Sequence, residues 1–326
     1  MSRYLPGLHA ARCLPLRATC ALLPIFATGL LSVGALAQDK PADASVSASA
    51  LPAGGSAGQK VLRVCQDPKN MPMSDQQDRG YENKIAALMA TKLGWKLEHT
   101  WYPQRMGFIR NTLKAKLPDS EDYKCDVVTA VSTDFDLGLA TKPYLSSTYA
   151  MAYVKGRGLD GIKTPDDLLK LDRSVRDKLK IGIFARSPAS DWLLKNGMID
   201  QMVSFQPQTG DAEQYPGQLI DRDLASGKVD VAIAWGPIVG YFAQHAGGVP
   251  IAVVPFAAEA DGIRYGFSIA MGVRYGDRVL RDQLNAVLDA SRPEIARILQ
   301  EYGVPTLPIL PIVPNTPTPA KSGAPS

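Results

Sequence analysis

The chain has 326 residues, 45% of them hydrophobic, which is enough to bury one large core or two moderate ones and excludes disorder throughout. Its formal net charge is +4, and removal of three arginines near the amino terminus would lower this to about +1. No run of lysine and arginine with interleaved aromatic residues occurs, so the composition does not support nucleic-acid binding.

The amino terminus predicts a secretory signal peptide over residues 1–37. Basic residues precede the apolar run ATCALLPIFATGLLSVG, and the small residues Ala35 and Ala37 form an A-x-A cleavage site. A retained membrane anchor is the alternative, because the run is nearly long enough to span a bilayer, but a small-residue site directly after the run favours cleavage. We therefore expect an exported, soluble product in the periplasm, not embedded in the membrane.

Residues 38–59 are small and polar, which predicts a flexible linker before a folded part that begins at Lys60. From there, apolar runs that end at turn residues predict strands, and apolar residues at three- and four-residue spacing predict helices. Gly94 is expected to end the first helix, and Thr164 to cap the third, with Asp167 in its first turn. The expected strands are 61–66, 95–102, 125–132, 148–155, 180–184, 202–206, 229–235, 251–256 and 266–273, and the expected helices are 82–94, 107–117, 163–171, 189–197, 215–227, 277–291 and 293–303.

Strands and helices that alternate with short connections predict an α/β fold built on a parallel sheet. The pattern restarts midway, and two closing helices are left over, which favours two lobes with a central cleft for a ligand or partner. We predict that lobe 1 comprises residues 60–154 and 262–304, and that lobe 2 comprises residues 155–261.

A proline-rich tail over residues 305–326 follows the last helix. Its prolines recur at every third residue from Pro305 to Pro317, the period of polyproline II. Packing of the tail on its own domain is the favoured interpretation, and a docking strap for another protein is the alternative.

Two cysteines remain after the signal peptide, Cys65 and Cys125. An oxidising compartment favours a disulfide between them. The expected strands, however, place Cys65 near the end of one strand and Cys125 at the start of its neighbour, a separation that challenges disulfide reach. The sequence leaves the pairing open.

The chain lacks the residues that an enzyme or a metal site needs. His99 and His245 are not in metal-spaced clusters, and no nucleophile elbow, phosphate-binding loop, dinucleotide fingerprint or C-x-x-C motif occurs. The acidic runs 134–136 and 221–223 do not continue into a calcium loop, so we interpret both as solvated. We expect no enzyme activity, no metal and no cofactor.

Polar and aromatic side chains follow several of the predicted strands, at the edge where open α/β folds bind ligands. Each taken alone fits a turn or packing role equally well, but together they predict a binding cleft. The predicted cleft residues are Asp67, Gln104, Arg105, Ser132, Thr133, Tyr144, Arg186, Ser187, Trp235, Pro237 and Tyr241.

The stretches LRVCQDP, GYENKIAALMATKLGWKLE, TPDDLLKL and KVDVAIAW, with the closing helices, resemble the periplasmic solute-binding proteins that hold polar amino acids. The resemblance implies their two-lobe fold. Two features of that family are missing, because STDFDLGLATKPY lacks the arginine that clamps an α-carboxylate, and Trp235 replaces the aspartate that receives the α-ammonium. Unpaired ionic groups in a closed cleft are costly, so an α-amino acid ligand is disfavoured.

A narrower resemblance is carried by YPQRMGFIRNTL, PYLSSTYA, AWGPIVGYFA and EIARILQEYGVP. These stretches look like the J proteins associated with pyrroloquinoline-quinone methanol dehydrogenases, MoxJ and XoxJ. The resemblance implies a periplasmic accessory protein that assists maturation or activation of such a dehydrogenase, with the large subunit of the methanol dehydrogenase as its expected partner. It transfers no catalytic residue.

Three functions remain as hypotheses. The first is a non-enzymatic accessory that grips a segment of the dehydrogenase in its cleft, with Trp235, Pro237 and Tyr241 as aromatic and rigid anchors. The second is solute capture for an ABC importer, with Arg105 and Arg186 receiving a small carboxylate ligand. The third, an enzyme on this fold, is disfavoured because no acid, base and nucleophile can be assembled.

Overall fold

The structure is a computed structural model that describes residues 60–206 and 214–309. These residues all belong to one unit, Ala57–Ser326, and the other unit, Met1–Ser56, lies entirely outside them. The predicted signal peptide (1–37), the linker (38–59) and residues 310–326 of the tail therefore lie outside the described residues.

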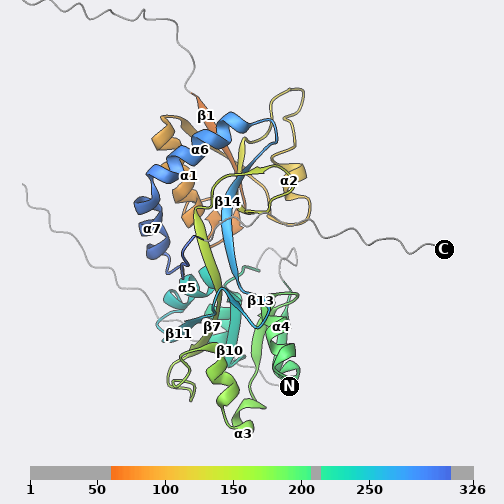
Figure 1. Cartoon of the computed structure of the whole chain (residues 1–326), viewed down its shortest axis with the longest axis vertical. Helices are drawn as coiled ribbons and strands as arrows, with labels where there is room; N and C mark the ends of the chain where they lie inside the picture. The colour runs from red at the N-terminus through yellow and green to blue at the C-terminus, as the bar shows by residue number, and fades with distance from the viewer. Residues whose placement is uncertain (1–59, 207–213, 310–326) are drawn as a thin grey trace, which may run out of the picture. The chain divides into compact units, whose positions relative to one another are not determined.

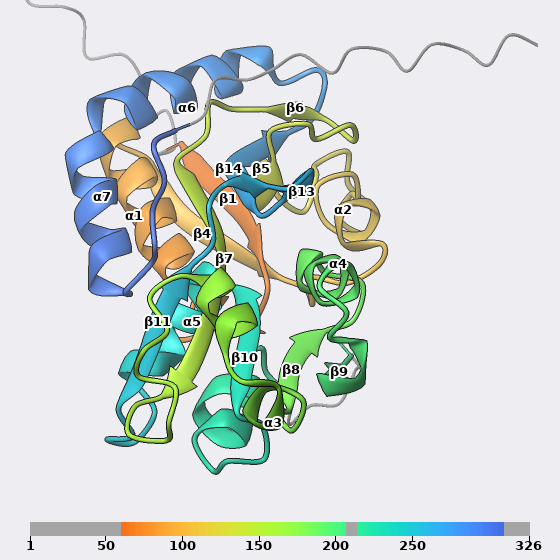
Figure 2. The ribbon, with the colours of Figure 1, turned by 60° about the horizontal axis from the view of Figure 1, so that its bottom comes forward.

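A ten-stranded mixed sheet forms the centre of the described unit, with strand order β4-β1-β5-β14-β7-β10-β8-β9, β11 paired to β7 and β6 paired to β14 (Figures 1 and 2). Two short ribbons, β2–β3 and β12–β13, lie outside it. The strands are β1 (Val61–Gln66), β2 (Lys69–Asn70), β3 (Ser74–Asp75), β4 (Lys96–Trp101), β5 (Val127–Ser132), β6 (Leu139–Ala140), β7 (Leu145–Val154), β8 (Ile181–Phe184), β9 (Met202–Phe205), β10 (Val231–Trp235), β11 (Ile251–Pro255), β12 (Glu259–Ala260), β13 (Ile263–Arg264) and β14 (Gly266–Val273).

The two ends of this sheet are parallel, but its middle is antiparallel. Strands β4, β1 and β5 run parallel to one another, as do β10, β8 and β9. Between these sets, β14 and β7 are antiparallel to each neighbour in the sheet order. The prediction of a parallel sheet is therefore right at the ends and wrong at the centre.

Strand β7 joins the two parallel sets. Residues Leu145–Thr148 pair with β14, and Tyr149–Tyr153 pair with β10. One continuous strand therefore passes from the first set into the second. Its pairing partner changes from β14 to β10 between Thr148 and Tyr149.

Helices cover both parallel sets. Helices α1, α6 and α7 pack together beside the β1 end of the sheet (Figure 2). The helices are α1 (Tyr81–Leu93), α2 (Phe108–Asn111), α3 (Arg173–Arg176), α4 (Pro188–Lys195), α5 (Gly236–Gln244), α6 (Arg278–Ala290) and α7 (Arg292–Glu301), with 3₁₀ helices η1 (Pro165–Lys170) and η2 (Ile199–Gln201) and a π-helix η3 (Leu219–Leu224).

Three predicted helices differ from the structure. Helix α2 is one turn, because Thr112 leaves the helical region at φ −123° and ψ −92°. The helix predicted from Thr164 is the 3₁₀ helix η1, although its predicted start is confirmed: the Thr164 backbone N–H donates to the Asp167 carboxylate at 2.8 Å. The helix predicted over 215–227 is reduced to η3, whose bonding is that of a π-helix.

Separate hydrophobic clusters lie in the two halves of the sheet. One cluster includes Leu62 of β1, Met89 of α1 and Leu284 of α6. A second cluster includes Ile183 of β8 and Ile233 of β10, and a third includes Ala232 of β10 and Leu219 of η3. This distribution supports two lobes, which we call lobe 1 and lobe 2 with the residues given above; their exact boundaries stay predictions.

A disulfide joins Cys65 and Cys125, with 5.7 Å between their Cα atoms. The sequence predicted a separation of the two cysteines that challenges disulfide formation. This expected separation is wrong because β5 begins at Val127 and not at Cys125. Val128 is the residue of β5 opposite Cys65, and the segment that precedes the strand brings Cys125 against it. Both cysteines are fully buried beside Phe108 and Leu113.

The first residues of the tail pack on their own chain. Ser147 Oγ of β7 donates to the Pro305 carbonyl, and the Leu307 N–H donates to the Ser146 carbonyl at 2.8 Å. An antiparallel bridge also joins Ser147 and Thr306. The tail therefore begins as a short extension of the sheet along β7.

Candidate functional site

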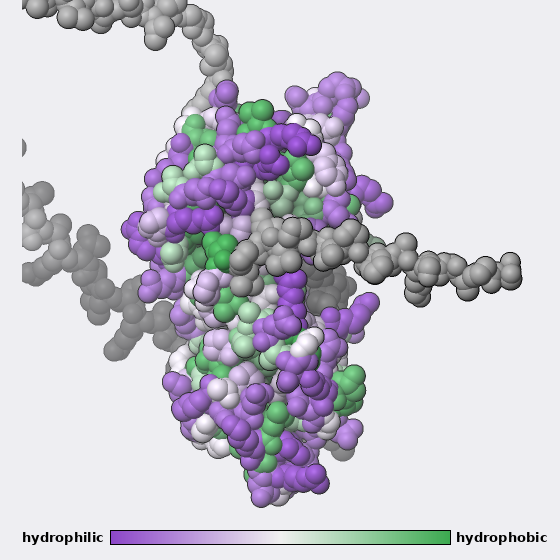
Figure 3. Space-filling view, in the orientation of Figure 1, coloured by the Kyte–Doolittle hydropathy of each residue, from purple (hydrophilic) through white to green (hydrophobic). Residues whose placement is uncertain are grey.

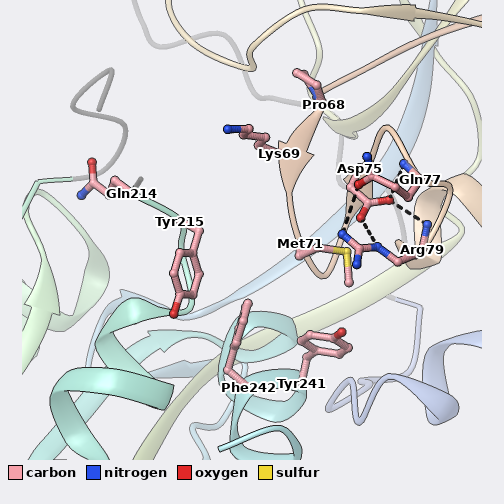
Figure 4. A pocket seen from close by; sticks show the side chains of 10 residues that line it. All are labelled: Pro68, Lys69, Met71, Asp75, Gln77, Arg79, Gln214, Tyr215, Tyr241 and Phe242. Carbon is pink, nitrogen blue, oxygen red and sulfur yellow. Dashed lines mark hydrogen bonds and ion pairs between the residues drawn. The ribbon is translucent and has the colours of Figure 1, made fainter. Parts of the chain in front are cut away.

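A pocket of about 450 Å³ lies between the β2–β3 ribbon of lobe 1 and helix α5 of lobe 2 (Figure 4). Its volume is within the range of small-ligand pockets. The lining residues are Pro68, Lys69, Met71, Asp75, Gln77, Arg79, Gln214, Tyr215, Tyr241 and Phe242.

Three aromatic rings form one wall. The ring centroids of Tyr215 and Phe242 are 5.7 Å apart, and those of Tyr241 and Phe242 are 5.1 Å apart with an interplanar angle of 87°. Gly217 lies against the Phe242 ring, where a Cβ would be only 2.3 Å from the ring atoms. A glycine at this position is therefore needed for the ring to pack as it does.

The Tyr241 ring is also held from behind. It stacks on Tyr302 at 5.6 Å and on His245 at 4.1 Å. One residue earlier, Gly240 meets the Gly303 carbonyl, where a Cβ would be 1.9 Å away. Helix α5 of lobe 2 therefore packs closely against the segment that follows α7 of lobe 1, and this contact fixes the aromatic wall.

The opposite wall is polar and is organised by Asp75. This buried carboxylate accepts hydrogen bonds from the backbone N–H groups of Gln77 at 3.1 Å and Arg79 at 2.8 Å, and from the Arg79 Nε at 2.6 Å. Arg79 Nη2 also donates to the Gln77 side-chain oxygen at 3.1 Å. The pairing of Asp75 with Arg79 therefore serves the structure of the loop before α1.

Tyr215 is anchored by an acidic residue outside the pocket. Its hydroxyl donates to Asp221 of η3, at 2.9 Å to each carboxylate oxygen. Burial, followed by this hydrogen bond, raises the pKa of Tyr215 to about 12. In the same acidic run, Asp223 is buried and pairs with Arg222 at 3.2 Å and Lys228 at 3.3 Å. The interpretation of 221–223 as solvated is therefore wrong for Asp223.

Of the predicted cleft residues, only Tyr241 lines this pocket. Asp67 instead closes a loop, since its carboxylate accepts from the backbone N–H groups of Lys69 and Gln104. The Gln104 side-chain oxygen accepts from Asn70 at 3.1 Å. Ser132 donates to Asp134 at the surface, and the neighbouring Thr133 is half-buried.

Tyr144 lies in the core of lobe 1. Its hydroxyl donates to the buried carboxylate of Glu82 at 2.9 Å and accepts from the Ala130 N–H at 3.3 Å. Thr129 Oγ1 donates to the other Glu82 oxygen at 2.7 Å. Tyr144, which directly precedes β7, and Thr129 of β5 therefore tie the first turn of α1 to the sheet.

The two arginines predicted to receive carboxylates are exposed. Arg105 follows β4 and Arg186 follows β8, and neither side chain makes an ion pair with any residue in 60–206 or 214–309. Arg186 has a φ of +58°, in the left-handed region. The next residue, Ser187, is buried, and its hydroxyl has no partner within the same ranges.

Trp235 stands at the carboxyl end of β10, as predicted, where the strand meets β7. It is half-buried, and its ring contacts Tyr149 at 5.8 Å and Phe267 at 5.9 Å in edge-to-face geometry. Pro237, in the first turn of α5, is buried. The Trp235 ring thus packs where β7 passes between the two parallel sets.

Replacing Trp235 with alanine is expected to lower the free energy of unfolding by about 2 kcal/mol, because a half-buried ring in two aromatic contacts is removed. Trp235→Phe is the matched control and should retain most of that stability. Urea denaturation of both variants measures the difference. If alanine left stability unchanged but abolished partner binding, Trp235 would be an exposed anchor instead of a packing residue.

The described residues contain no cluster of side chains that could bind a metal ion. No group of three His, Cys, Asp or Glu residues there could hold an ion. His99 stacks on Trp101 at 4.7 Å, and burial lowers its pKa. None of the helices in the described residues is both long enough and apolar enough to span a membrane.

Most pocket residues were missed because they lie in loops and not at strand ends. Lys69, Met71, Asp75, Gln77 and Arg79 all fall within KNMPMSDQQDRG, which the sequence predicts only as a loop. The feature of the sequence that indicates this pocket is the aromatic pair Tyr241-Phe242. Only Tyr241 of this pair is among the predicted cleft residues.

The chain is similar to the MoxJ and XoxJ proteins in both sequence and structure. No family model matches the chain. Protein MoxJ of Methylorubrum extorquens is 27% identical over 310 residues, which cover 90% of this chain and 97% of MoxJ. The crystal structure of MxaJ from Methlophaga aminisulfidivorans MPT is 26% identical, with a TM-score of 0.62, and covers 76% of this chain and 100% of MxaJ.

The crystal structure of the periplasmic binding protein XoxJ from Methylobacterium extorquens AM1 is 34% identical to this chain. It has a TM-score of 0.60, and the match covers 76% of this chain and 99% of XoxJ. This extent of identity, together with the mixed sheet and its covering helices, shows that the chain belongs to the MoxJ/XoxJ family and has the α/β fold of periplasmic binding proteins.

Proposed function

We propose that this protein is a periplasmic, non-enzymatic accessory of a PQQ-dependent alcohol dehydrogenase, of the methanol dehydrogenase type, and that it assists maturation or activation of that enzyme. The observation that carries the proposal is the identity with XoxJ across nearly the whole of that protein. The partner would be held between the lobes, where Tyr241 and its neighbours form a preformed aromatic wall.

The pocket's polar groups support a macromolecular partner over a zwitterionic solute. Asp75 is already bound by Arg79 and two backbone N–H groups, and the Tyr215 hydroxyl is bound by Asp221. A zwitterion that entered would lose its hydration without finding a dedicated pair of charges. Aromatic side chains, by contrast, contribute much of the binding energy at protein interfaces.

The second candidate function is capture of a small acid for an ABC importer. The exposed guanidinium groups of Arg105 and Arg186, without ion pairs in the described ranges, favour it. The PQQ cofactor of the dehydrogenase, a tricarboxylate, is one such acid. Calorimetric titration with PQQ and simple di- and tricarboxylates tests this candidate, and an absence of heat on every titration would count against it.

Native mass spectrometry of the protein captured from its own periplasm during growth on alcohol tests the accessory function. We expect a dehydrogenase subunit in the complex, and we expect dehydrogenase activity per enzyme molecule to fall when the accessory gene is deleted. A bound small molecule without any protein partner would instead support the importer component.

A further inference from the structure

We infer that residues 303–307, which we call the brace, hold the two lobes in one relative orientation. Binding proteins with two lobes commonly close around a solute by rotation of the lobes about the strands that connect them. The brace opposes such a rotation, so the protein offers its partner a fixed surface. This inference goes beyond the proposed function, because it depends on contacts within the chain and on no particular partner.

The brace is anchored to a strand that connects the lobes. Strand β7 pairs with β14 in lobe 1 and with β10 in lobe 2, so a rotation of the lobes has to bend the chain between these two pairings. The brace turns back at the end of α7 and runs beside the lobe 1 part of β7 (Figure 2). The Leu307 N–H donates to the Ser146 carbonyl at 2.8 Å, and the Ser147 hydroxyl donates to the Pro305 carbonyl.

Helix α5 of lobe 2 rests on the brace through two glycines. Gly236 and Gly240 are about one turn apart and therefore lie on the same face of α5. A Cβ at Gly240 would be 1.9 Å from the Gly303 carbonyl oxygen. A Cβ at Gly236 would be 2.5 Å from the Pro305 ring and 2.3 Å from the Thr148 carbonyl oxygen. No flexible side chain separates α5 from these groups, so a rotation that pressed α5 toward the brace would be blocked.

Apolar contacts oppose the rotation in the other direction. The Tyr241 ring of α5 stacks on Tyr302, which directly precedes the brace, with 5.6 Å between the ring centroids. Tyr241 packs against hydrophobic clusters of both lobes, and so do Met71 and Met73 in the turn of the β2–β3 ribbon. A rotation that moved α5 away would expose these side chains to water, which is unfavourable.

Closure of the lobes around a solute would have to break these contacts. A ligand can shift a protein between two conformations only by as much as it binds one of them more tightly. The contacts of the brace raise the difference in affinity that a solute must supply, and they therefore oppose solute capture by closure. A partner that binds between fixed lobes, by contrast, meets a surface that is already ordered, so little free energy is lost on ordering it.

Distance measurements between the lobes by pulsed electron paramagnetic resonance test the inference. Spin labels are attached at Ala286→Cys of α6 and Leu194→Cys of α4, which are both exposed, and the surface over α6 is mostly hydrophilic (Figure 3). Cys65 and Cys125 are buried and bonded to each other, so they do not react with the label. The exported chain is used, without the predicted signal peptide and its cysteines. We expect a single narrow distribution of distances that does not change when PQQ or citrate is added.

Two variants that disturb the brace should let the lobes move. Gly240→Ala places a methyl group against the Gly303 carbonyl without weakening α5, because alanine favours a helix more than glycine does. Leu307→Pro removes the N–H that donates to Ser146. We expect each variant to give a broader distribution or a second distance. Gly276→Ala, where the Cβ would meet open space, is the matched control and should keep the narrow distribution.

Contrary results would overturn the inference in two ways. A broad distribution in the protein that carries only the labels, or a shift on addition of PQQ or citrate, would show that the lobes move despite the brace. Narrow distributions in both Gly240→Ala and Leu307→Pro would show that other contacts fix the lobes. Circular dichroism checks that each variant is folded, and Leu307→Pro decides alone if Gly240→Ala is not. Capture of a dehydrogenase tests the proposed function separately, and its failure would leave the measured distances unaffected.

Discussion

Replacing Cys65 and Cys125 with alanine together is expected to lower the free energy of unfolding by about 4 kcal/mol. The disulfide closes a loop with a sequence separation of 60 residues, and closing a loop of that size removes roughly this much entropy from the unfolded chain. Alanine is preferred to serine because both positions are fully buried among apolar side chains, where an unpaired hydroxyl would add its own cost.

Urea denaturation of the double variant, with wild type in oxidising and in reducing buffer, measures this effect. Reduced wild type is the matched control, since it loses the cross-link without losing the sulfur atoms. We expect both to unfold at a lower urea concentration than oxidised wild type. If reduction left the midpoint unchanged and the alanine pair cost less than about 1 kcal/mol, the cross-link would contribute little.

The sequence predicted those elements whose boundaries are set by local chemistry. The helix expected over 82–94 is α1, and Gly94 ends it in the left-handed region at φ +69°, as its position indicated. The capping residues of η1 were likewise predicted from Thr164. In both cases the residues that determine the end of the element lie within a few positions of it.

Strand direction was not predictable in the same way. The runs that became β7 and β14 are mostly apolar and are buried over most of their length, like β5 and β10 beside them, so their composition does not mark them as antiparallel. Whether such a run is parallel or antiparallel depends on the neighbour it meets, and β14 meets β7 only after more than a hundred residues of intervening chain.

The pocket coincides with the predicted cleft residues at Tyr241 alone. Trp235 does end β10, but its direction is set by its register opposite Tyr149 of β7, so it packs there and does not line the pocket. The charged pocket residues come from a loop that folds back as the β2–β3 ribbon, with Lys69 opposite Asp75. This pairing brings residues together that no strand pattern or motif in the sequence marks.

Replacing Glu82 with glutamine is expected to stabilise the protein above neutral pH and to have little effect near pH 5. Glu82 is fully buried, its side chain is bound only by the hydroxyls of Thr129 and Tyr144 among the described residues, and burial raises its pKa from 4.5 to about 7. The hydroxyl bonds lower the pKa but do not compensate for the lost hydration.

The sign of the pH effect follows from proton release. Below pH 4.5 the carboxyl is protonated in both states, so it adds no pH dependence. Between pH 4.5 and 7 the folded protein keeps the proton that the unfolded chain has lost, so stability falls by about 1.4 kcal/mol per pH unit. Above pH 7 the loss of unfolding free energy is complete, at roughly 3 kcal/mol. The glutamine variant does not lose this stability because glutamine cannot ionise.

Urea denaturation at pH 5, 6, 7 and 8 should therefore show a stability difference between Glu82→Gln and wild type that grows with pH and levels off near pH 8. Glu259→Gln, at an exposed position in β12, is the matched control and should show no such growth. A constant difference for Glu82→Gln would mean that its carboxyl ionises equally in both states. A growing difference would mean that the hydrogen bonds from Thr129 and Tyr144 to α1 require a buried carboxyl whose ionisation destabilises the fold.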